Sequence, residues 1–196
     1  AIALEALLLS GLSMLVAGSS APASGGEHLI SHYIDMKQAL YGTANDLHGV
    51  QVGVATVHCL QLWEKVLALG PDSIDPDALA DAQPANEQIE KWAIEDWGAD
   101  VAAEVIAQWK QKSRPRDVLR AEITSFRDRL PQIREAVSKD LLPSTTVANA
   151  IRESGGPTAP EGMNAPIEEY HNALLRARYI RNRFTILDLA AELGAL

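Results

Sequence analysis

Apolar residues recur every three to four positions along almost the whole chain, and this period restricts the fold more than any other feature. Within residues 26–42 the apolar positions are Leu29, Ile30, Tyr33, Ile34 and Leu40. Residues 48–69 contain alternating valines, which would also suit a strand. The length of that segment and its Leu- and Trp-rich second half favour a long helix.

The remaining periodic segments also read as helices. They are expected at residues 1–17, 76–82, 86–97, 99–112, 115–138, 140–152, 167–184 and 185–196. A bend is expected at Pro131, which cannot donate a backbone hydrogen bond. Thr185 and Asp188 resemble a capping box with Asp in place of Glu. The sequence therefore predicts an all-α fold, a multi-helix bundle formed by residues 1–196 as a single domain.

The first helix, residues 1–17, is apolar on nearly every side, which is typical of a buried helix. The small residues that follow it mimic a signal-peptidase site, but the segment lacks a positive first part and contains Glu5. It is also too short and too interrupted for a membrane span. The chain starts at Ala1 in the middle of a helical pattern, so we expect a processed protein or a piece of a longer one.

Charge and composition exclude several classes of protein. The formal net charge of −9 argues against a nucleic-acid partner, because such proteins need clustered cationic surfaces. A single cysteine, Cys59, excludes an internal disulfide and indicates a reducing, cytoplasmic location. No strand is followed by a Gly-rich turn and a helix, so the chain carries no dinucleotide-binding fingerprint of its own.

Three histidines are the candidates for chemistry. His28 and His32 are four residues apart and share one face of a helix, and His48 begins the next long helix. Imidazoles arranged in this way can converge on a metal ion, with Glu27 or Ser31 orienting them. A polar contact between helices explains the same spacing, and both readings stay open at this point. His58 and His171 are assigned structural roles.

Two further features have a plain and a functional reading. The basic stretch 176–183 could bind a phosphate, but a helix face whose arginines pair with acidic residues is the simpler interpretation. The tryptophans fall at helical spacing and are read as packing anchors rather than as a ligand cage. These residues are Trp63, Trp92, Trp97 and Trp109.

Three ordered motifs resemble those of the glycerol-1-phosphate dehydrogenases. The segment "SSAPASGGEHLISHYIDM" resembles the family's S-R-P-A-S-G-x-E-H-x-x-S-H, "LHGVQVGVAT" resembles its second His-Gly segment, and "YIRNRFTILDLAAELG" resembles its C-terminal R-x-R-[YF]-T-x-L-D-L-A. That family belongs to the superfamily of iron-containing alcohol dehydrogenases, glycerol dehydrogenases and dehydroquinate synthases. The similarity extends over nearly the whole chain.

The resemblance implies a dehydroquinate synthase-like C-terminal domain whose N-terminal α/β domain, which binds NAD or NADP, is absent from this chain. It implies a divalent metal (zinc, iron or nickel) between the two domains, with His28 and His48 as ligands. The third ligand, an Asp, belongs to the N-terminal side, and His32 lies at the substrate side as a catalytic residue. The metal would polarise an alcohol or polyol hydroxyl for hydride transfer to nicotinamide. The isolated chain would be inactive.

One position departs from the family pattern. Ala21 stands where an Arg usually precedes the proline, and a guanidinium is well suited to bind phosphate, so the phosphorylated substrate is in doubt. The alternatives are a non-enzymatic helical binding module with a vestigial metal site and, less well matched, phosphate elimination of the dehydroquinate synthase kind. Whether the protein forms a homo-oligomer stays open.

Overall fold

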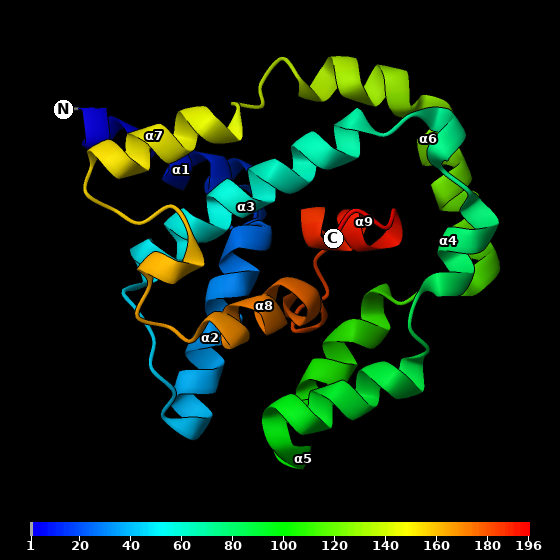
Figure 1. The fold of residues 1–196 in the computed structure, drawn as a ribbon, viewed down its shortest axis with the longest axis horizontal. Coiled ribbons are helices and arrows are strands. Elements are labelled where there is room, and N and C mark those ends of the chain that lie inside the picture. The colour runs from blue at the N-terminus through cyan, green and yellow to red at the C-terminus, as the bar shows by residue number, and fades with distance from the viewer. Residues whose placement is uncertain (1) are drawn as a thin grey trace.

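The computed structural model describes residues 2–196, with side chains from residue 4 onward, and Ala1 lies outside the described residues. The predicted all-α fold is confirmed, because every regular element in this range is helical (Figure 1). The α-helices are α1 (Ile2–Ala17), α2 (Gly26–Tyr41), α3 (His48–Ala68), α4 (Pro76–Ala82), α5 (Asn86–Lys112), α6 (Arg116–Val137), α7 (Ser144–Glu153), α8 (Ile167–Arg176) and α9 (Ile186–Glu192). Short 3-10 helices are η1 (Ala21–Ala23), η2 (Pro71–Ser73), η3 (Pro160–Gly162) and η4 (Ala177–Tyr179).

The core forms where α2, α3, α8 and α9 meet. The C-terminal helix α9 lies near the centre of the molecule, with α3, α8 and the α4–α6 pair around it (Figure 1). The apolar faces predicted from the 3.6-residue period point into this core. Its fully buried side chains include Ile30, Tyr33, Val54, Tyr170 and Leu187.

The expected helix pair 86–97 and 99–112 forms a hairpin within α5. Gly98 adopts φ 71° and ψ 163°, a conformation that breaks the helix and that only glycine adopts readily. Trp97, just before the break, packs its ring edge-on against Tyr33 at 4.7 Å between centroids. All four tryptophans pack in or against the core, as predicted. Helix α6 contains Pro131 and bends along its course (Figure 1).

The helix predicted over 167–184 ends early, and this prediction was wrong. Helix α8 stops at Arg176, a single 3-10 turn follows, and residues 180–184 are not helical. The ammonium group of Lys112 donates hydrogen bonds to the backbone carbonyls of Arg178 and Arg183. These carbonyls therefore accept hydrogen bonds from α5 instead of the helical hydrogen bonds that would continue α8.

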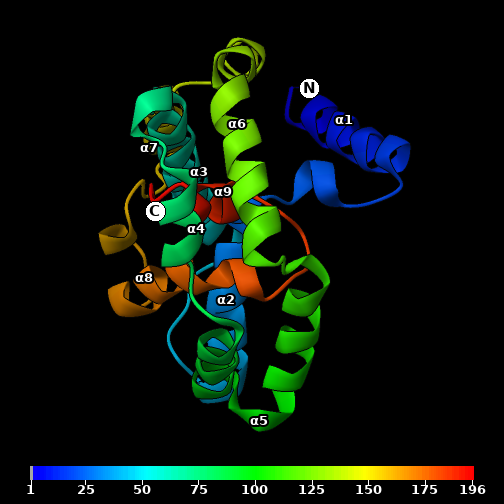
Figure 2. The ribbon, with the colours of Figure 1, turned by 90° about the vertical axis from the view of Figure 1, so that its right-hand side faces the viewer.

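The prediction that the first helix is buried was also wrong. Helix α1 forms, but it stands away from the bundle, and its principal contacts are with η1 (Figure 2). Its large apolar side chains are exposed, up to 90% for Val16. An all-round apolar pattern predicts burial only where a partner surface exists, and the described part of this chain supplies none. Within residues 2–196, no helix combines the length and the apolar character that crossing a bilayer requires.

Candidate metal centre

The glycine pair before the histidines allows the chain to pack tightly where α2 begins. The Gly25 N–H donates to Glu27 Oε1 at 2.8 Å, and a Cβ added at Gly25 would lie only 2.7 Å from the Glu27 carboxylate. A Cβ at Gly26 would lie 3.1 Å from Leu187 and 3.2 Å from Cys59. The backbone at the start of α2 therefore approaches α9 and α3 closely, which fixes the position of the residues that follow.

Arg183 holds this turn from the other end of the chain. Its guanidinium donates to the Ser24 carbonyl and, at 3.2 Å, to Ser20 Oγ. Gly25 is the N-cap of α2, and no side chain caps the helix. Arg176 of the same basic stretch pairs with Asp96 at 2.9 Å, so the charge-pairing interpretation is confirmed for this arginine. No ion pair among residues 2–196 involves Arg178, Arg181 or Arg183, and for these three it was wrong.

The three imidazoles come together where α2 and α3 begin. The ring centroids of His28 and His48 lie 5.4 Å apart, those of His32 and His48 5.9 Å, and those of His28 and His32 6.3 Å. His28 and His32 lie on one face of α2, and His48 is the first residue of α3. The spacing along the sequence thus becomes one cluster in space.

The hydrogen bond of His28 decides which nitrogen of its ring is free. His28 Nδ1 lies 2.9 Å from Glu27 Oε1. An ionised carboxylate only accepts hydrogen bonds, so Nδ1 carries a proton, and in the neutral imidazole Nε2 keeps its lone pair. The Gly25 N–H binds the same carboxylate oxygen and holds it in place.

A buried relay decides the same question for His48. Gln51 Nε2 donates to Asp35 Oδ1 at 3.1 Å and to the Asp46 carbonyl at 2.8 Å, so Gln51 Oε1 points toward Ser31. Ser31 Oγ has a single proton, and it donates this proton to Gln51 Oε1 in a hydrogen bond of 2.8 Å. The 2.9 Å contact between Ser31 Oγ and His48 Nδ1 must then be donated by the imidazole. His48 Nε2 is therefore also a free acceptor.

His32 completes the cluster as a neutral ring. Burial lowers the pKa of His32, and its neighbours His48, Arg181 and His28 lower it further, whereas Asp35 opposes the shift. A lowered pKa keeps the imidazole uncharged near neutrality. Such a ring can accept a hydrogen bond or a proton from a molecule bound beside it.

The ligand set of the cluster is small. Within residues 2–196, no group of three or more His, Cys, Asp or Glu side chains is arranged to hold a metal ion. His28 and His48 are the pair whose free Nε2 atoms could coordinate one, since imidazole nitrogen is a common ligand of divalent transition metals. Metal-ligating histidines usually donate their second ring N–H to a neighbouring group, as both do here.

Sequence reasoning placed Glu27 and Ser31 near the histidines but missed Gln51. Gln51 is three residues after His48 on the same helix face, a spacing that could have identified it. His58 lies outside the cluster. Its Nδ1 is 2.9 Å from the Tyr170 hydroxyl, a contact that joins α3 to α8.

Comparison with known proteins gives matches to enzymes of one name. The chain is 27% identical over 194 residues to a glycerol-1-phosphate dehydrogenase [NAD(P)+] of Geobacillus stearothermophilus, covering 98% of this chain and 38% of that protein. It is 53% identical over 60 residues to the enzyme of Halalkalibacterium halodurans, covering 31% of this chain and 15% of the relative. The enzyme of Caldivirga maquilingensis is 39% identical over 72 residues, 35% of this chain and 20% of the relative.

These proteins are homologues of the chain, as the sequence motifs indicated. The chain spans between 15% and 38% of the length of these three relatives. No protein-family model matches it, and no solved structure matches it significantly.

Proposed function

We propose that this chain is the metal-binding part of an NAD(P)-dependent dehydrogenase that oxidises an alcohol or polyol. The observation that carries the proposal is the shared tautomer of His28 and His48. Each ring donates its Nδ1–H to a neighbouring group, and each keeps Nε2 free, with the two rings 5.4 Å apart. Homology to glycerol-1-phosphate dehydrogenases supports the reaction class.

The two imidazoles fit a divalent metal but do not complete its coordination shell. Zinc, iron and nickel all accept imidazole nitrogen, and catalytic sites usually add a third protein ligand. We propose that an Asp of an N-terminal nucleotide-binding domain supplies this ligand, as the family resemblance implies. That domain would also bind NAD or NADP.

The residues of this chain then have distinct roles. His28 and His48 would hold the metal, which would supply Lewis-acid activation of the substrate hydroxyl, and the nicotinamide would supply the hydride acceptor. Glu27 and Ser31 fix the rings of His28 and His48 through their Nδ1–H groups. His32, neutral and half-buried, lies beside both ligands and would accept a hydrogen bond from the substrate.

The substrate is proposed only as a small alcohol or polyol. Ala21 lies in the turn before α2, where the related enzymes usually present an arginine, and alanine cannot bind a phosphate group. The natural gene product that contains this chain should therefore be assayed with both glycerol 1-phosphate and unphosphorylated polyols. A preference for the unphosphorylated compounds is the expected result.

Cobalt(II) titration of the 196-residue chain tests the metal site, because the absorption of this ion reports its ligands. We expect saturable binding that weakens by at least about tenfold in His28→Ala and in His48→Ala. His58→Ala is the matched control, since His58 lies on α3 but outside the cluster, and it should bind as the parent chain does. Undiminished binding in the first two variants would refute the assignment.

The incomplete ligand set among residues 2–196 favours one alternative, a helical binding module with a vestigial metal site. Activity of the natural gene product separates the two. Oxidation of any polyol with NAD(P)+, lost in His28→Ala, supports the dehydrogenase. Metal binding without such activity supports the module.

A further inference from the structure

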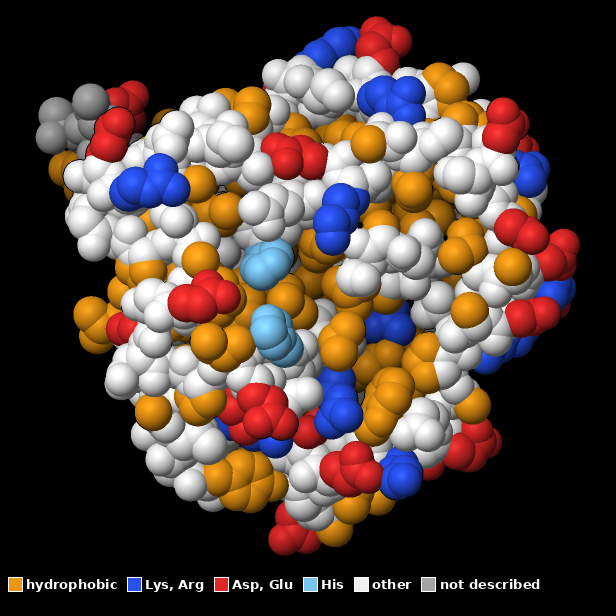
Figure 3. All heavy atoms as spheres, viewed as in Figure 1, with side chains coloured by type: hydrophobic (Ala, Val, Ile, Leu, Met, Phe, Trp, Pro, Cys, Tyr) orange, Lys and Arg blue, Asp and Glu red, His pale blue; other side chains and the backbone are white. Residues whose placement is uncertain are grey.

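A second site candidate lies on the far side of α9 from α3, between α4, α5 and α6. The face of the molecule seen in Figure 3 is hollowed to the right of its centre, with apolar and basic side chains in the depth. A cavity of about 240 Å³ opens among the two ends of the α5 hairpin, the start of α6, η4 and α9. Its lining includes three arginines and one carboxylate, namely Arg114, Arg116, Arg178 and Glu192.

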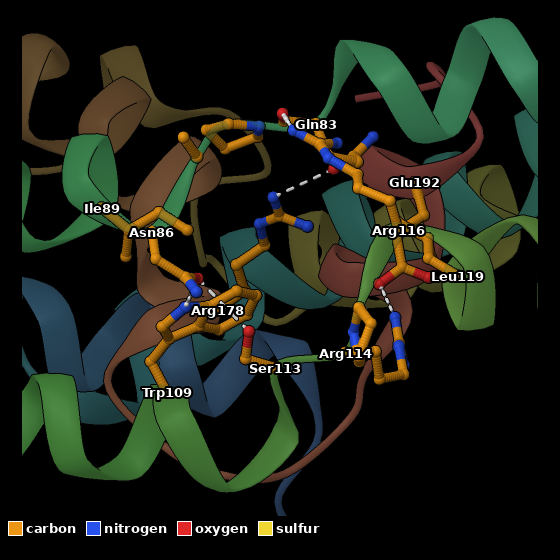
Figure 4. A pocket seen from close by; sticks show the side chains of 13 residues that line it. Gln83, Asn86, Ile89, Trp109, Ser113, Arg114, Arg116, Leu119, Arg178 and Glu192 are labelled. Carbon is orange, nitrogen blue, oxygen red and sulfur yellow. Dashed lines mark hydrogen bonds and ion pairs between the residues drawn. The ribbon is translucent and has the colours of Figure 1, made fainter.

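Arg178 is a buried cation without a carboxylate partner. Its side chain rises between the wall formed by Asn86 and Trp109 and the wall formed by Arg116 and Glu192 (Figure 4). The residue is 3% exposed, and no carboxylate oxygen among residues 2–196 lies within ion-pair distance of its guanidinium.

The partners of this guanidinium are neutral and do not use all its donors. Arg178 Nη2 donates to the Tyr179 hydroxyl at 2.7 Å and to Gln83 Oε1 at 3.4 Å. Its Nε is buried and has no partner in the described chain. Buried charges are normally paired, and arginine presents its donors in a fork that matches an oxyanion. Glu192 is a nearby carboxylate, but it pairs with Arg114 and not with Arg178, so the Arg178 guanidinium has no directly bound anion among residues 2–196.

The other two arginines of the cavity differ in their partners. Arg114 pairs with Glu192 and with Glu122. Arg116 donates to the backbone carbonyls of Ala80 and Gln83, and it too has no carboxylate partner among residues 2–196. With Glu122 counted, three guanidinium groups face two carboxylates, so the cavity has a formal excess of one positive charge.

Two helices also begin at this cavity. Asn86 is the first residue of α5, Arg116 is the first residue of α6, and both line the cavity. Neither helix start is capped by a side chain. The backbone N–H groups of a first helical turn, together with the helix dipole, favour a bound anion. Two such ends therefore add to the attraction that Arg178 exerts.

We propose that this cavity is a binding site for a small oxyanion, the phosphate or carboxylate group of a metabolite, with Arg178 as its principal ligand. None of the histidines of the metal centre lines the cavity, so the site is separate from the proposed dehydrogenase chemistry. The apolar side chains of Ile89 and Leu119 beside the arginines leave room for a short carbon body attached to the anion (Figure 4).

Calorimetric titration of the 196-residue chain with inorganic phosphate tests the proposal. We expect saturable binding of one phosphate per chain that sodium chloride at equal ionic strength does not reproduce. A parallel titration with succinate separates the two chemical classes, since tighter binding of phosphate or of the dicarboxylate identifies the natural group. Absence of saturable binding by both compounds would refute the site.

Two variants connect the binding to the cavity. Arg178→Gln should weaken phosphate binding by about ten- to a hundredfold, the range for losing a charge-assisted hydrogen bond. Asn86→Asp is a second variant, chosen because it should keep the fold even if Arg178→Gln does not. A carboxylate there still accepts the hydrogen bonds that Asn86 Oδ1 receives from Trp109 and Ser113, and it suits a helix start. Its charge should abolish phosphate binding.

Matched controls keep the outcome unambiguous. Arg152→Gln removes an exposed arginine of α7 outside the cavity, and His28→Ala alters only the metal centre, so both should bind phosphate as the parent chain does. Unchanged binding in both Arg178→Gln and Asn86→Asp would overturn the proposal, and it would leave the proposed dehydrogenase function untouched.

Discussion

The ion pair between Lys112 and Asp188 should be the most costly single contact to break in this fold. Lys112 Nζ lies 2.7 Å from Asp188 Oδ1, and the two side chains are only 8% and 2% exposed. Asp188 Oδ2 accepts the Thr185 N–H at 2.8 Å and so closes the predicted capping box of α9. The pair therefore fastens the end of α5 to the beginning of the C-terminal helix.

Asp188→Asn separates the two contributions of Asp188, because it removes the charge that pairs with Lys112 and keeps the oxygen that caps α9. The amide oxygen of asparagine still accepts the Thr185 N–H, so most of the capping contribution, about 1 kcal/mol, is retained. Lys112 is left as a buried cation whose remaining hydrogen bonds go to backbone carbonyls. Removing one partner of a buried pair costs about 3–5 kcal/mol, a large part of the 5–15 kcal/mol by which ordinary domains are stable.

Urea unfolding followed by far-ultraviolet circular dichroism measures this cost, and the chain offers a matched control. Lys110 and Glu90 form a pair of nearly equal length, 2.8 Å, that also involves α5, but these side chains are 59% and 38% exposed. Glu90→Gln should change the free energy of unfolding by less than about 1 kcal/mol. If Asp188→Asn costs no more than Glu90→Gln, burial does not govern the strength of these pairs and the reasoning fails.

Two further measurements identify the stranded charge as the cause. Lys112→Met in the Asp188→Asn background should recover part of the lost stability, because it removes the unpaired cation. Burial lowers the pKa of Lys112 below its usual 10.5, and Asp188 opposes this shift. Without the Asp188 carboxylate, the pKa of Lys112 in the folded chain falls further below 10.5. Between that lowered pKa and 10.5, the unfolded chain therefore binds more protons than the folded chain. The stability of Asp188→Asn should accordingly rise as the pH increases toward 10.5.

Three smaller perturbations test other parts of the molecule. Ser31→Ala removes the acceptor of the His48 Nδ1–H and should weaken cobalt(II) binding about ten- to a hundredfold; equal affinity would show that the relay does not orient the ring. Burial lowers the pKa of His58, so stability should fall as the pH drops below 6.5, and His58→Gln should flatten that slope in urea unfolding at several pH values. Gly26→Val inserts a side chain against Leu187 and should cost about 1–3 kcal/mol in thermal or urea unfolding, whereas a neutral result would mean that the turn can shift.

The sequence predicts the fold best where local chemistry decides the structure. The short helix expected at 76–82 has those bounds, because Asp75 caps it and Pro76 suits its first turn. The break at Gly98 and the capping box at Thr185 were likewise visible, since a glycine with positive φ and a reciprocal side-chain cap act within a few residues.

Long-range contacts explain where sequence reasoning failed. The end of α8 depends on Lys112, which is 66 residues away from the Arg178 carbonyl that it binds. No local pattern around residue 176 contains that information. The exposure of α1 has a similar origin, because a helical period reports an apolar surface but not whether another element covers it.

The candidate metal centre combines both kinds of information. The spacing of His28 and His32 places two rings on one helix face, and His48 stands out at the start of the next helix. The free Nε2 atoms follow only from the partners in the structure, Glu27 for His28 and the buried Ser31 and Gln51 for His48. The arginine-lined cavity could not be foreseen, since it forms where α5 and α6 begin far apart in the sequence.

The two motifs at opposite ends of the chain form one structural unit. Arg183 binds the turn that precedes α2, and Gly26 packs against Leu187 of α9. Asp188 follows directly and is fixed by Lys112, so a rigid series of contacts leads from α5 through α9 to the backbone that carries His28. The C-terminal motif contributes no imidazole to the cluster, yet it holds the segment that carries His28 and His32. This arrangement gives Arg183 a structural role that does not require it to touch a substrate.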